Sequence, residues 1–182
     1  MSIGIGNRGN VQGLTTHKLG CIRGERAVFA GLDLALNPGR AMLLSGPNGS
    51  GKSSLLRVLA GLLPAAGGRV DWEGTDVTED RDGHRARVAY IGRADPLKPS
   101  LTASENLAFW AKLYGFDPDI EPALFQFAIE PLADVPVRYL SAGQRRRVTL
   151  ARLALGQNSQ AGPTLWLLDE PATGLDPGAV SM

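Results

Sequence analysis

Eight residues at positions 46–53, Gly-Pro-Asn-Gly-Ser-Gly-Lys-Ser, constrain this chain more than any other segment does. They fit G-x-x-x-x-G-K-[ST], the pattern of a phosphate-binding P-loop. The flanking apolar runs predict a buried strand at residues 41–44 and a helix at residues 54–60, and this order is the context that the pattern requires. The alternative is an ordinary glycine-rich turn before a helix, and the flanking runs argue against it.

The P-loop predicts where a triphosphate would bind. Its glycines let backbone N–H groups approach phosphate oxygens, and the N-terminus of the following helix adds partial positive charge. We expect Lys52 to reach the β and γ phosphates and Ser53 to hold Mg²⁺. The cofactors implied are therefore ATP and Mg²⁺. The residues predicted to bind nucleotide here are Gly46, Pro47, Asn48, Gly49, Ser50, Gly51, Lys52, Ser53 and Ser54.

A second chemical motif follows a short apolar run at residues 164–168 and consists of Asp169 and Glu170. Such a run is typical of a strand buried on both faces of a parallel sheet. Acidic residues at its carboxyl end face the crevice in which ligands bind. We expect Asp169 to hold Mg²⁺ and Glu170 to polarise the attacking water as a general base. Without the P-loop this pattern would be weak evidence.

Composition excludes several other classes of protein. The 182 residues are 43% hydrophobic and 20% charged, as in a globular domain, and the net charge of +1 predicts no nucleic-acid partner. Cys21 is the single cysteine, so we expect a small buried hydrophobe rather than a redox or metal residue. Residues 1–18 lack the apolar core of a secretory signal, and we expect a loose leader there.

The remaining pattern predicts an α/β fold with N-terminal antiparallel strands and a mainly parallel core sheet. We expect one domain over residues 19–182. Extended segments are expected at residues 19–29, 32–36, 69–72 and 88–91, with a turn at residues 37–39.

Between the strands, residues of about 95–145 predict a helical subdomain. Thr102 and Glu105 have the spacing of a capping box, and Gly115 is placed to end the helix that they begin. Further helical segments are expected at residues 120–134 and 142–155. The aromatic residues of this insert form either the core of the subdomain or a face for a partner.

The segment Leu140-Ser141-Ala142-Gly143-Gln144 opens the last of these helices, and Ser141 can cap it. Taken with the P-loop, the acidic pair and Gly174-Leu175-Asp176, this order of motifs resembles the ATPase domains of ABC transporters over roughly residues 19–180. Ala142 stands where that family usually has glycine. The resemblance implies that two copies pair head to tail. ATP on one P-loop would then be capped by Ser141, Gly143 and Gln144 of the other copy, with Asp176 at the same interface.

A finer resemblance is to the ATP-binding subunit of the haem exporter of c-type cytochrome maturation in bacteria. It rests on residues 21–26, 29–32, 70–72 and 90–92. This resemblance implies a peripheral protein on the cytoplasmic face of the inner membrane, beneath a polytopic membrane subunit that its ATP hydrolysis energises.

Three departures from the family pattern leave alternatives open. Arg23 stands where an aromatic residue usually stacks on adenine, and it either stacks there or is solvated. Arg93 replaces the usual glutamine and either approaches the γ-phosphate or membrane partner, or is a surface charge. His17 and His84 are expected in polar loops, and neither is the family's switch histidine. With the chain ending at Met182, we expect a truncated or weakly active form.

The rival functions are a nucleotide-binding module with poor hydrolysis and the ATPase of another ABC transporter. A chromosome-maintenance ATPase would need a long coiled coil between its motifs, and a translation-associated ATPase normally carries two such cassettes.

Overall fold

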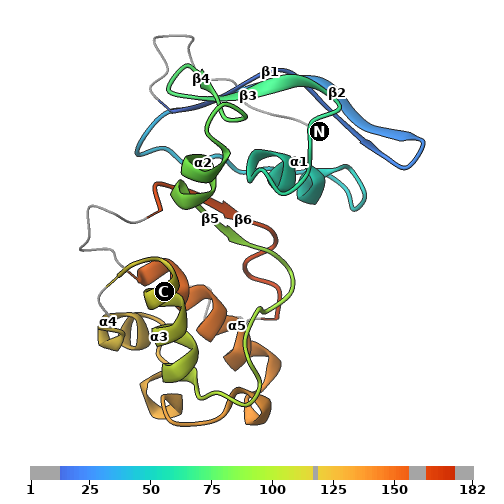
Figure 1. Cartoon of the computed structure of the whole chain (residues 1–182). Coiled ribbons are helices and arrows are strands. Elements are labelled where there is room, and N and C mark those ends of the chain that lie inside the picture. Colours follow the sequence, from blue (N-terminus) through green and yellow to red (C-terminus); the bar gives the residue numbers. More distant parts are fainter. Residues whose placement is uncertain (1–12, 117–118, 156–162, 175–182) are drawn as a thin grey trace. The chain divides into compact units, whose positions relative to one another are not determined.

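The structure is a computed structural model that describes residues 13–116, 119–155 and 163–174 (Figure 1). The chain divides into a first unit, Met1–Ala86, and a second unit, Arg87–Met182. The single domain expected over residues 19–182 stays a prediction.

The first unit holds an antiparallel sheet, as the sequence predicts for this region, and the structure shows that its strand order is β2-β1-β3-β4. Its elements are β1 (Leu14–Arg23), β2 (Arg26–Leu36), α1 (Lys52–Leu59), β3 (Gly67–Trp72), β4 (Thr75–Asp76) and α2 (Arg81–Arg87). The boundary expected for the leader is wrong, because β1 begins at Leu14 and not at residue 19. Leu14 pairs with Leu36 on one side and with Trp72 on the other, so both neighbours stabilise the start of this strand.

Apolar side chains of α1 and β1 share a buried core. Leu55 and Leu19 have no exposed surface, and Cys21 is buried as expected. A buried threonine supports the irregular part of the β1–β2 ladder. The Oγ1 of Thr16 donates to the carbonyl of Leu32 and accepts from the amide of Leu34, each at 2.9 Å.

The strand expected before the P-loop is absent from the described structure. Residues 41–44 adopt no regular structure, and the side chain of Leu43 is 88% exposed. A strand is stabilised by hydrogen bonds to a neighbour, and the described residues of the first unit pair no strand with this segment. The helix expected after the loop is confirmed as α1.

The second unit contains a parallel pair of strands, β5 (Val88–Ile91) and β6 (Leu165–Leu168). Their register runs from Val88↔Leu165 to Ile91↔Leu168. The expectation that β6 is buried on both faces is wrong. Leu165 and Leu167 are buried, whereas Trp166 between them is 48% exposed. Successive side chains of a strand point to opposite faces, so one face of β6 is the more open.

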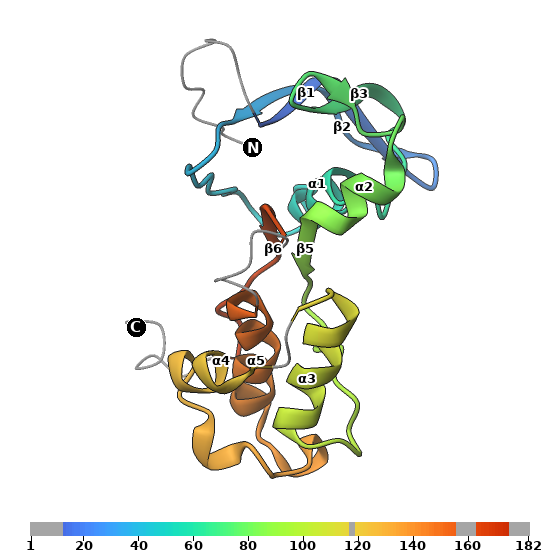
Figure 2. The same ribbon diagram turned by 60° about the vertical axis from the view of Figure 1, so that its left-hand side comes forward.

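Helices lie between β5 and β6 in the described part of the second unit, as the sequence predicts. They are α3 (Ala103–Leu113), α4 (Glu121–Gln126) and α5 (Ala142–Ala151), with 3₁₀ turns at Glu130–Leu132, Val137–Tyr139 and Arg152–Ala154. Helices α3 and α5 lie side by side (Figures 1 and 2). Leu107, Ile129 and Val148 pack in a shared core with no exposed surface. The capping box of Thr102 and Glu105 is confirmed.

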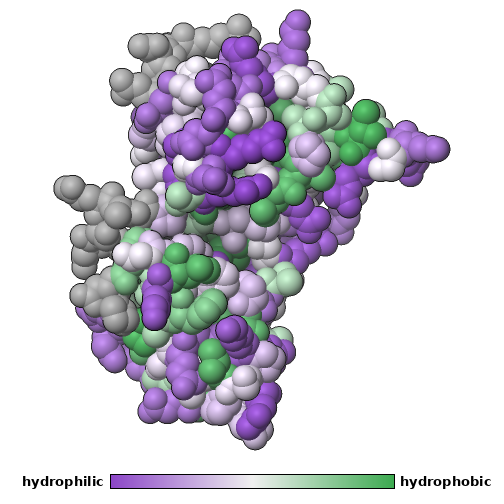
Figure 3. Space-filling model, in the orientation of Figure 1, coloured by the Kyte–Doolittle hydropathy of each residue, from purple (hydrophilic) through white to green (hydrophobic). Residues whose placement is uncertain are grey.

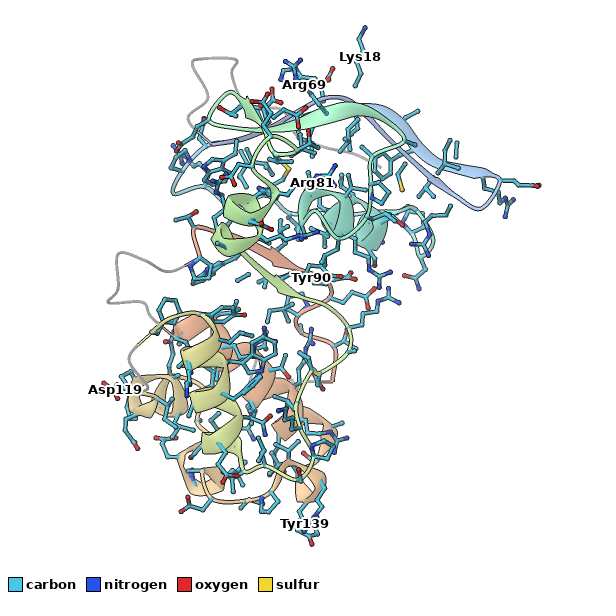
Figure 4. All side chains as sticks on the ribbon, viewed as in Figure 1. Lys18, Arg69, Arg81, Tyr90, Asp119 and Tyr139 are labelled. Carbon is cyan, nitrogen blue, oxygen red and sulfur yellow. The ribbon has the colours of Figure 1, made fainter. Side chains whose placement is uncertain are left out.

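Apolar side chains also reach the surface of this helical part (Figure 3). The most exposed are Leu113, Phe125 and Tyr139, and Tyr139 points outward at the edge of the unit (Figure 4). Trp110 instead packs against the core, so the aromatic residues of the insert serve both inside and outside. Among the described residues, no helix has both the length and the apolar character needed to cross a bilayer.

Candidate nucleotide-binding site

The P-loop turns through backbone conformations that favour glycine. Gly49 and Gly51 have φ values of 81° and 95°. Gly51 is also closely approached, because an added Cβ would lie 2.6 Å from Cγ1 of Val28. A side chain at this position would therefore collide with Val28 of β2.

Lys52 folds back over the loop in which it sits. Its Nζ donates to the carbonyl oxygens of Gly46 at 2.8 Å and Pro47 at 2.9 Å. No side chain caps the N-terminus of α1, whose N-cap residue is Gly51. The loop thus presents backbone amides, the partial positive charge of a helix end and one ammonium group, which together suit a polyphosphate.

In the second unit, the acidic pair lies where β6 ends. Asp169 is 3% exposed, and its amide donates to the carbonyl of Ile91 at 2.8 Å, which extends the β5–β6 ladder. Glu170 follows with a φ of 52°, an uncommon conformation for a residue other than glycine. The end of the strand therefore fixes one carboxylate inside the protein and turns the next one outward.

Arg93 contacts this turn directly. Its Nη2 forms an ion pair with Oε1 of Glu170, although the Arg93 side chain is 60% exposed. The other carboxylate oxygen, Oε2, lies 3.4 Å from Oγ1 of Thr173. Arg93 is therefore engaged by an acidic residue of its own chain, a partner that the sequence did not predict.

Sequence reasoning did not predict that an arginine is buried at this site. Arg146 is 3% exposed, and its guanidinium donates to the carbonyls of Gly92 at 2.8 Å, Glu170 at 3.1 Å and Pro171 at 3.1 Å. It also pairs with the carboxylate of Asp95 at 3.2 Å. One side chain of α5 thereby joins the segment after β5 to the segment after β6.

Sequence spacing does not single out this arginine. Arg145, Arg146 and Arg147 are consecutive, and each has two buried residues three and four positions on, among Val148, Thr149, Leu150 and Ala151. A charge on a buried face requires partners, which here are backbone carbonyls and a carboxylate.

The turn before α5 has the predicted cap. The Oγ of Ser141 accepts from the amide of Gln144 at 3.2 Å, and Oε1 of Gln144 accepts from the amide of Ser141 at 2.8 Å. Gly143 packs closely, because an added Cβ would lie 2.9 Å from the carbonyl oxygen of Gly174. Glycine is thus required by a close approach at position 143.

The structure distributes the predicted site residues between the two units. The P-loop and Arg23 belong to the first unit, where Arg23 is exposed at the end of β1. Ser141, Asp169 and Glu170 belong to the second unit. Asp176 lies outside the described residues. Whether Arg23 stacks on a base stays a prediction.

The expectation that both histidines lie in polar loops is wrong. His17 lies within β1, and its Nε2 is 3.2 Å from the carboxylate of Asp71. His84 is 1% exposed on α2, with Nε2 2.8 Å from the carbonyl of Leu59. His17 lies in regular structure because β1 pairs with β3 at this point, where His17 stands opposite Arg69. In the described part of the chain, no three His, Cys, Asp or Glu residues are grouped as a metal site would require.

Comparison with known proteins gives consistent matches. A family model described as ABC transporter matches residues 29–173. The chain is 53% identical over 163 residues to the cytochrome c biogenesis ATP-binding export protein CcmA of Rhodospirillum rubrum, a match that covers 89% of this chain and 68% of the relative. A protein of the same name from Paramagnetospirillum magneticum is 49% identical over 172 residues, with 90% and 76% covered.

Solved structures agree with these matches. One described as the ATP-binding subunit of an ABC transporter superposes with a TM-score of 0.80 at 26% identity, covering 93% of this chain and 70% of that one. The α/β fold of a P-loop NTPase and the resemblance read from the motifs are confirmed.

Proposed function

We propose that this chain, which belongs to the ABC transporter family, is the ATP-binding and ATP-hydrolysing subunit of a membrane exporter for cytochrome c biogenesis, of the haem-exporter type. The observation that carries the proposal is the joint presence of a P-loop before α1 and the Asp169-Glu170 pair at the end of β6. The names of the two bacterial relatives supply the biological role.

Nucleotide binding begins at the P-loop. The carbonyls of Gly46 and Pro47 now accept from Lys52, and phosphate oxygens would take over these hydrogen bonds. A charged acceptor binds an ammonium group more strongly than a neutral carbonyl does. The exchange leaves the loop backbone in place while the lysine turns toward the β and γ phosphates.

The residues expected to hold Mg²⁺ fit that ion in their chemistry. The hydroxyl of Ser53 and the carboxylate of Asp169 are hard oxygen donors, which Mg²⁺ prefers. When bound, Mg²⁺ supplies charge neutralisation on the phosphates.

Glu170 is the general base in this proposal. Its Oε1 pairs with Arg93, whereas the contact of Oε2 with Thr173 is long at 3.4 Å, so Oε2 is the oxygen placed to accept a proton. As water attacks the γ-phosphorus, the bond from that phosphorus to the bridging β–γ oxygen breaks, and Glu170 receives the proton from the water.

A second copy of the chain completes the site. The Oγ of Ser141 accepts from its own helix, so its hydrogen is left to donate to a γ-phosphate oxygen held by the other copy. The amides at the start of α5 add a second helix N-terminus beside the same phosphate. We propose a head-to-tail dimer bound at the cytoplasmic face of the inner membrane to a polytopic membrane subunit, with no nucleic-acid partner.

Two measurements test this function. Phosphate release at saturating Mg-ATP should be substantial for the wild type and fall on the order of 1,000-fold for Glu170→Gln, because the base is lost. Equal rates near zero for both proteins would favour a hydrolysis-poor binding module. A deletion strain should lose haem-stained c-type cytochromes and regain them with the wild type but not with Glu170→Gln. Normal cytochromes in the deletion strain would contradict the assigned pathway.

A further inference from the structure

We propose that Arg146 is a positioning residue for hydrolysis, which holds the general base Glu170 of its own chain from the helix that presents Ser141 to the other copy. The inference rests on the proposed function. Arg146 lies outside the P-loop, the segment at residues 140–144 and the acidic pair.

The contacts of Arg146 show what it holds. Four backbone carbonyls accept from its guanidinium, and one of them belongs to Glu170 itself. Glu170 has a φ of 52°, a conformation that residues other than glycine keep only where their surroundings impose it. A planar guanidinium with several donors in fixed directions is suited to impose it. Arg146 thus fixes the backbone from which the catalytic carboxylate projects.

A second contact ties the same helix to the same segment. Gly143, in the first turn of α5, lies so close to Gly174 that an added Cβ would be 2.9 Å from its carbonyl oxygen. Gly174 follows Glu170 by four residues in the chain. The start of α5 is therefore held at two places against the segment that carries the general base.

The side chain of Glu170 has its own support. Arg93 pairs with Oε1 from the segment after β5, and Arg146 holds that segment through the carbonyl of Gly92 and the carboxylate of Asp95. Arg146 consequently acts on Glu170 along two routes, through its backbone and through the segment that bears Arg93.

This arrangement has a mechanistic consequence. Ser141, at the start of α5, meets the ATP held by the other copy, while Arg146 on the same helix holds the Glu170 that serves the ATP on its own P-loop. A shift of α5 as the dimer closes is transmitted to that glutamate. Closure of the dimer therefore sets the geometry of the general base at each ATP site.

Substitution of Arg146 should lower turnover and leave nucleotide binding intact. We expect Arg146→Met to reduce kcat about 100-fold, the loss that follows small misplacement of a reacting group. The dissociation constant for ATP should stay within about threefold, because Lys52 and its loop are unchanged. Arg146→Lys should recover part of the activity. The matched control is Arg147→Met, since Arg147 donates to the carbonyl of Ala128 and not to the segment that carries Glu170.

Mixed dimers of the full chain separate this role from a general structural one. Arg146→Met is mixed with Ser141→Arg. The arginine introduced at position 141 prevents that helix from capping the ATP held by the other copy. If Arg146 serves its own Glu170, both defects fall on the same ATP site of a mixed dimer, so the second site works and activity returns. Mixed with Glu170→Gln, the two defects fall on different sites and no activity returns.

A control mixture distinguishes failure of this proposal from failure of the proposed function. Glu170→Gln mixed with Ser141→Arg must recover activity in any head-to-tail dimer, and no recovery there would reject the dimer itself. If that control recovers activity, two results overturn the role of Arg146. One is that Glu170→Gln restores the activity of Arg146→Met, and the other is that neither Glu170→Gln nor Ser141→Arg restores it. Thermal melting checks that Arg146→Met is folded, and Arg146→Lys replaces it in the mixtures if it is not.

Discussion

Two helices of this protein begin with the same kind of N-cap, and the pair allows a controlled test of the role assigned to Ser141. In α5, Oγ of Ser141 lies 3.2 Å from the amide of Gln144, and in α3, Oγ1 of Thr102 lies 3.1 Å from the amide of Glu105. The amide of each cap residue also donates the reciprocal bond to the side chain three positions on, so both are full capping boxes. Ser141→Ala and Thr102→Ala remove equivalent bonds from the fold.

The two substitutions should cost similar stability. Loss of an N-cap costs about 1 kcal/mol. For a chain of 182 residues this corresponds to a fall in Tm of about 2–4 °C. Hydrolysis should separate them, because only the Ser141 hydroxyl is assigned to the γ-phosphate. Loss of one donor to a developing charge costs on the order of 100-fold in kcat, or about 2.7 kcal/mol.

Differential scanning calorimetry and steady-state phosphate release, applied to both variants, give the comparison. We expect matched melting temperatures and a large difference in turnover. If Ser141→Ala hydrolyses ATP as fast as Thr102→Ala does, Ser141 acts only as a cap and its assignment to the phosphate is wrong.

Three other predictions follow from single contacts. The side-chain and backbone hydrogen bonds from Thr78 hold the pKa of Asp76 below its ordinary value of 3.8, so this stabilisation is present above that value and is lost as pH falls through the lowered pKa. Thr78→Val should raise the pKa of Asp76 in an NMR titration, and an unchanged pKa would refute the hydroxyl's part. Gly143→Ala should lower kcat at least tenfold, whereas Ala142→Gly should not, and phosphate release measures both. Leu107→Ala should reduce the free energy of unfolding in urea by about 2–5 kcal/mol, and a loss below 1 kcal/mol would contradict its place in the core.

Local rules predicted the parts of the fold that depend on neighbours in sequence. The strand at residues 88–91 was predicted with the bounds that β5 shows, and the caps at Thr102 and Ser141 follow from side chains three positions apart. A capping residue and its partner lie within one turn, so sequence spacing alone specifies their geometry.

The features that the sequence did not predict correctly depend on partners that are distant in sequence. Residues 41–44 are apolar enough for a strand, yet strand formation depends on a paired neighbour that composition does not specify. The burial of His84 depends on Leu59, and the burial of Arg146 depends on carbonyls that follow two different strands. Sequence reasoning therefore found the residues assigned to phosphate chemistry and missed the arginine that holds one of them.

The most direct test of the central claim is the oligomeric state of Glu170→Gln with and without Mg-ATP, measured by analytical ultracentrifugation. The account predicts a dimer with Mg-ATP, because ATP that is bound between the two copies and is not hydrolysed holds the dimer together. It predicts a monomer without nucleotide and a monomer when Ser141→Arg is added. A monomer under every condition, or a dimer that forms equally well without nucleotide, would contradict it.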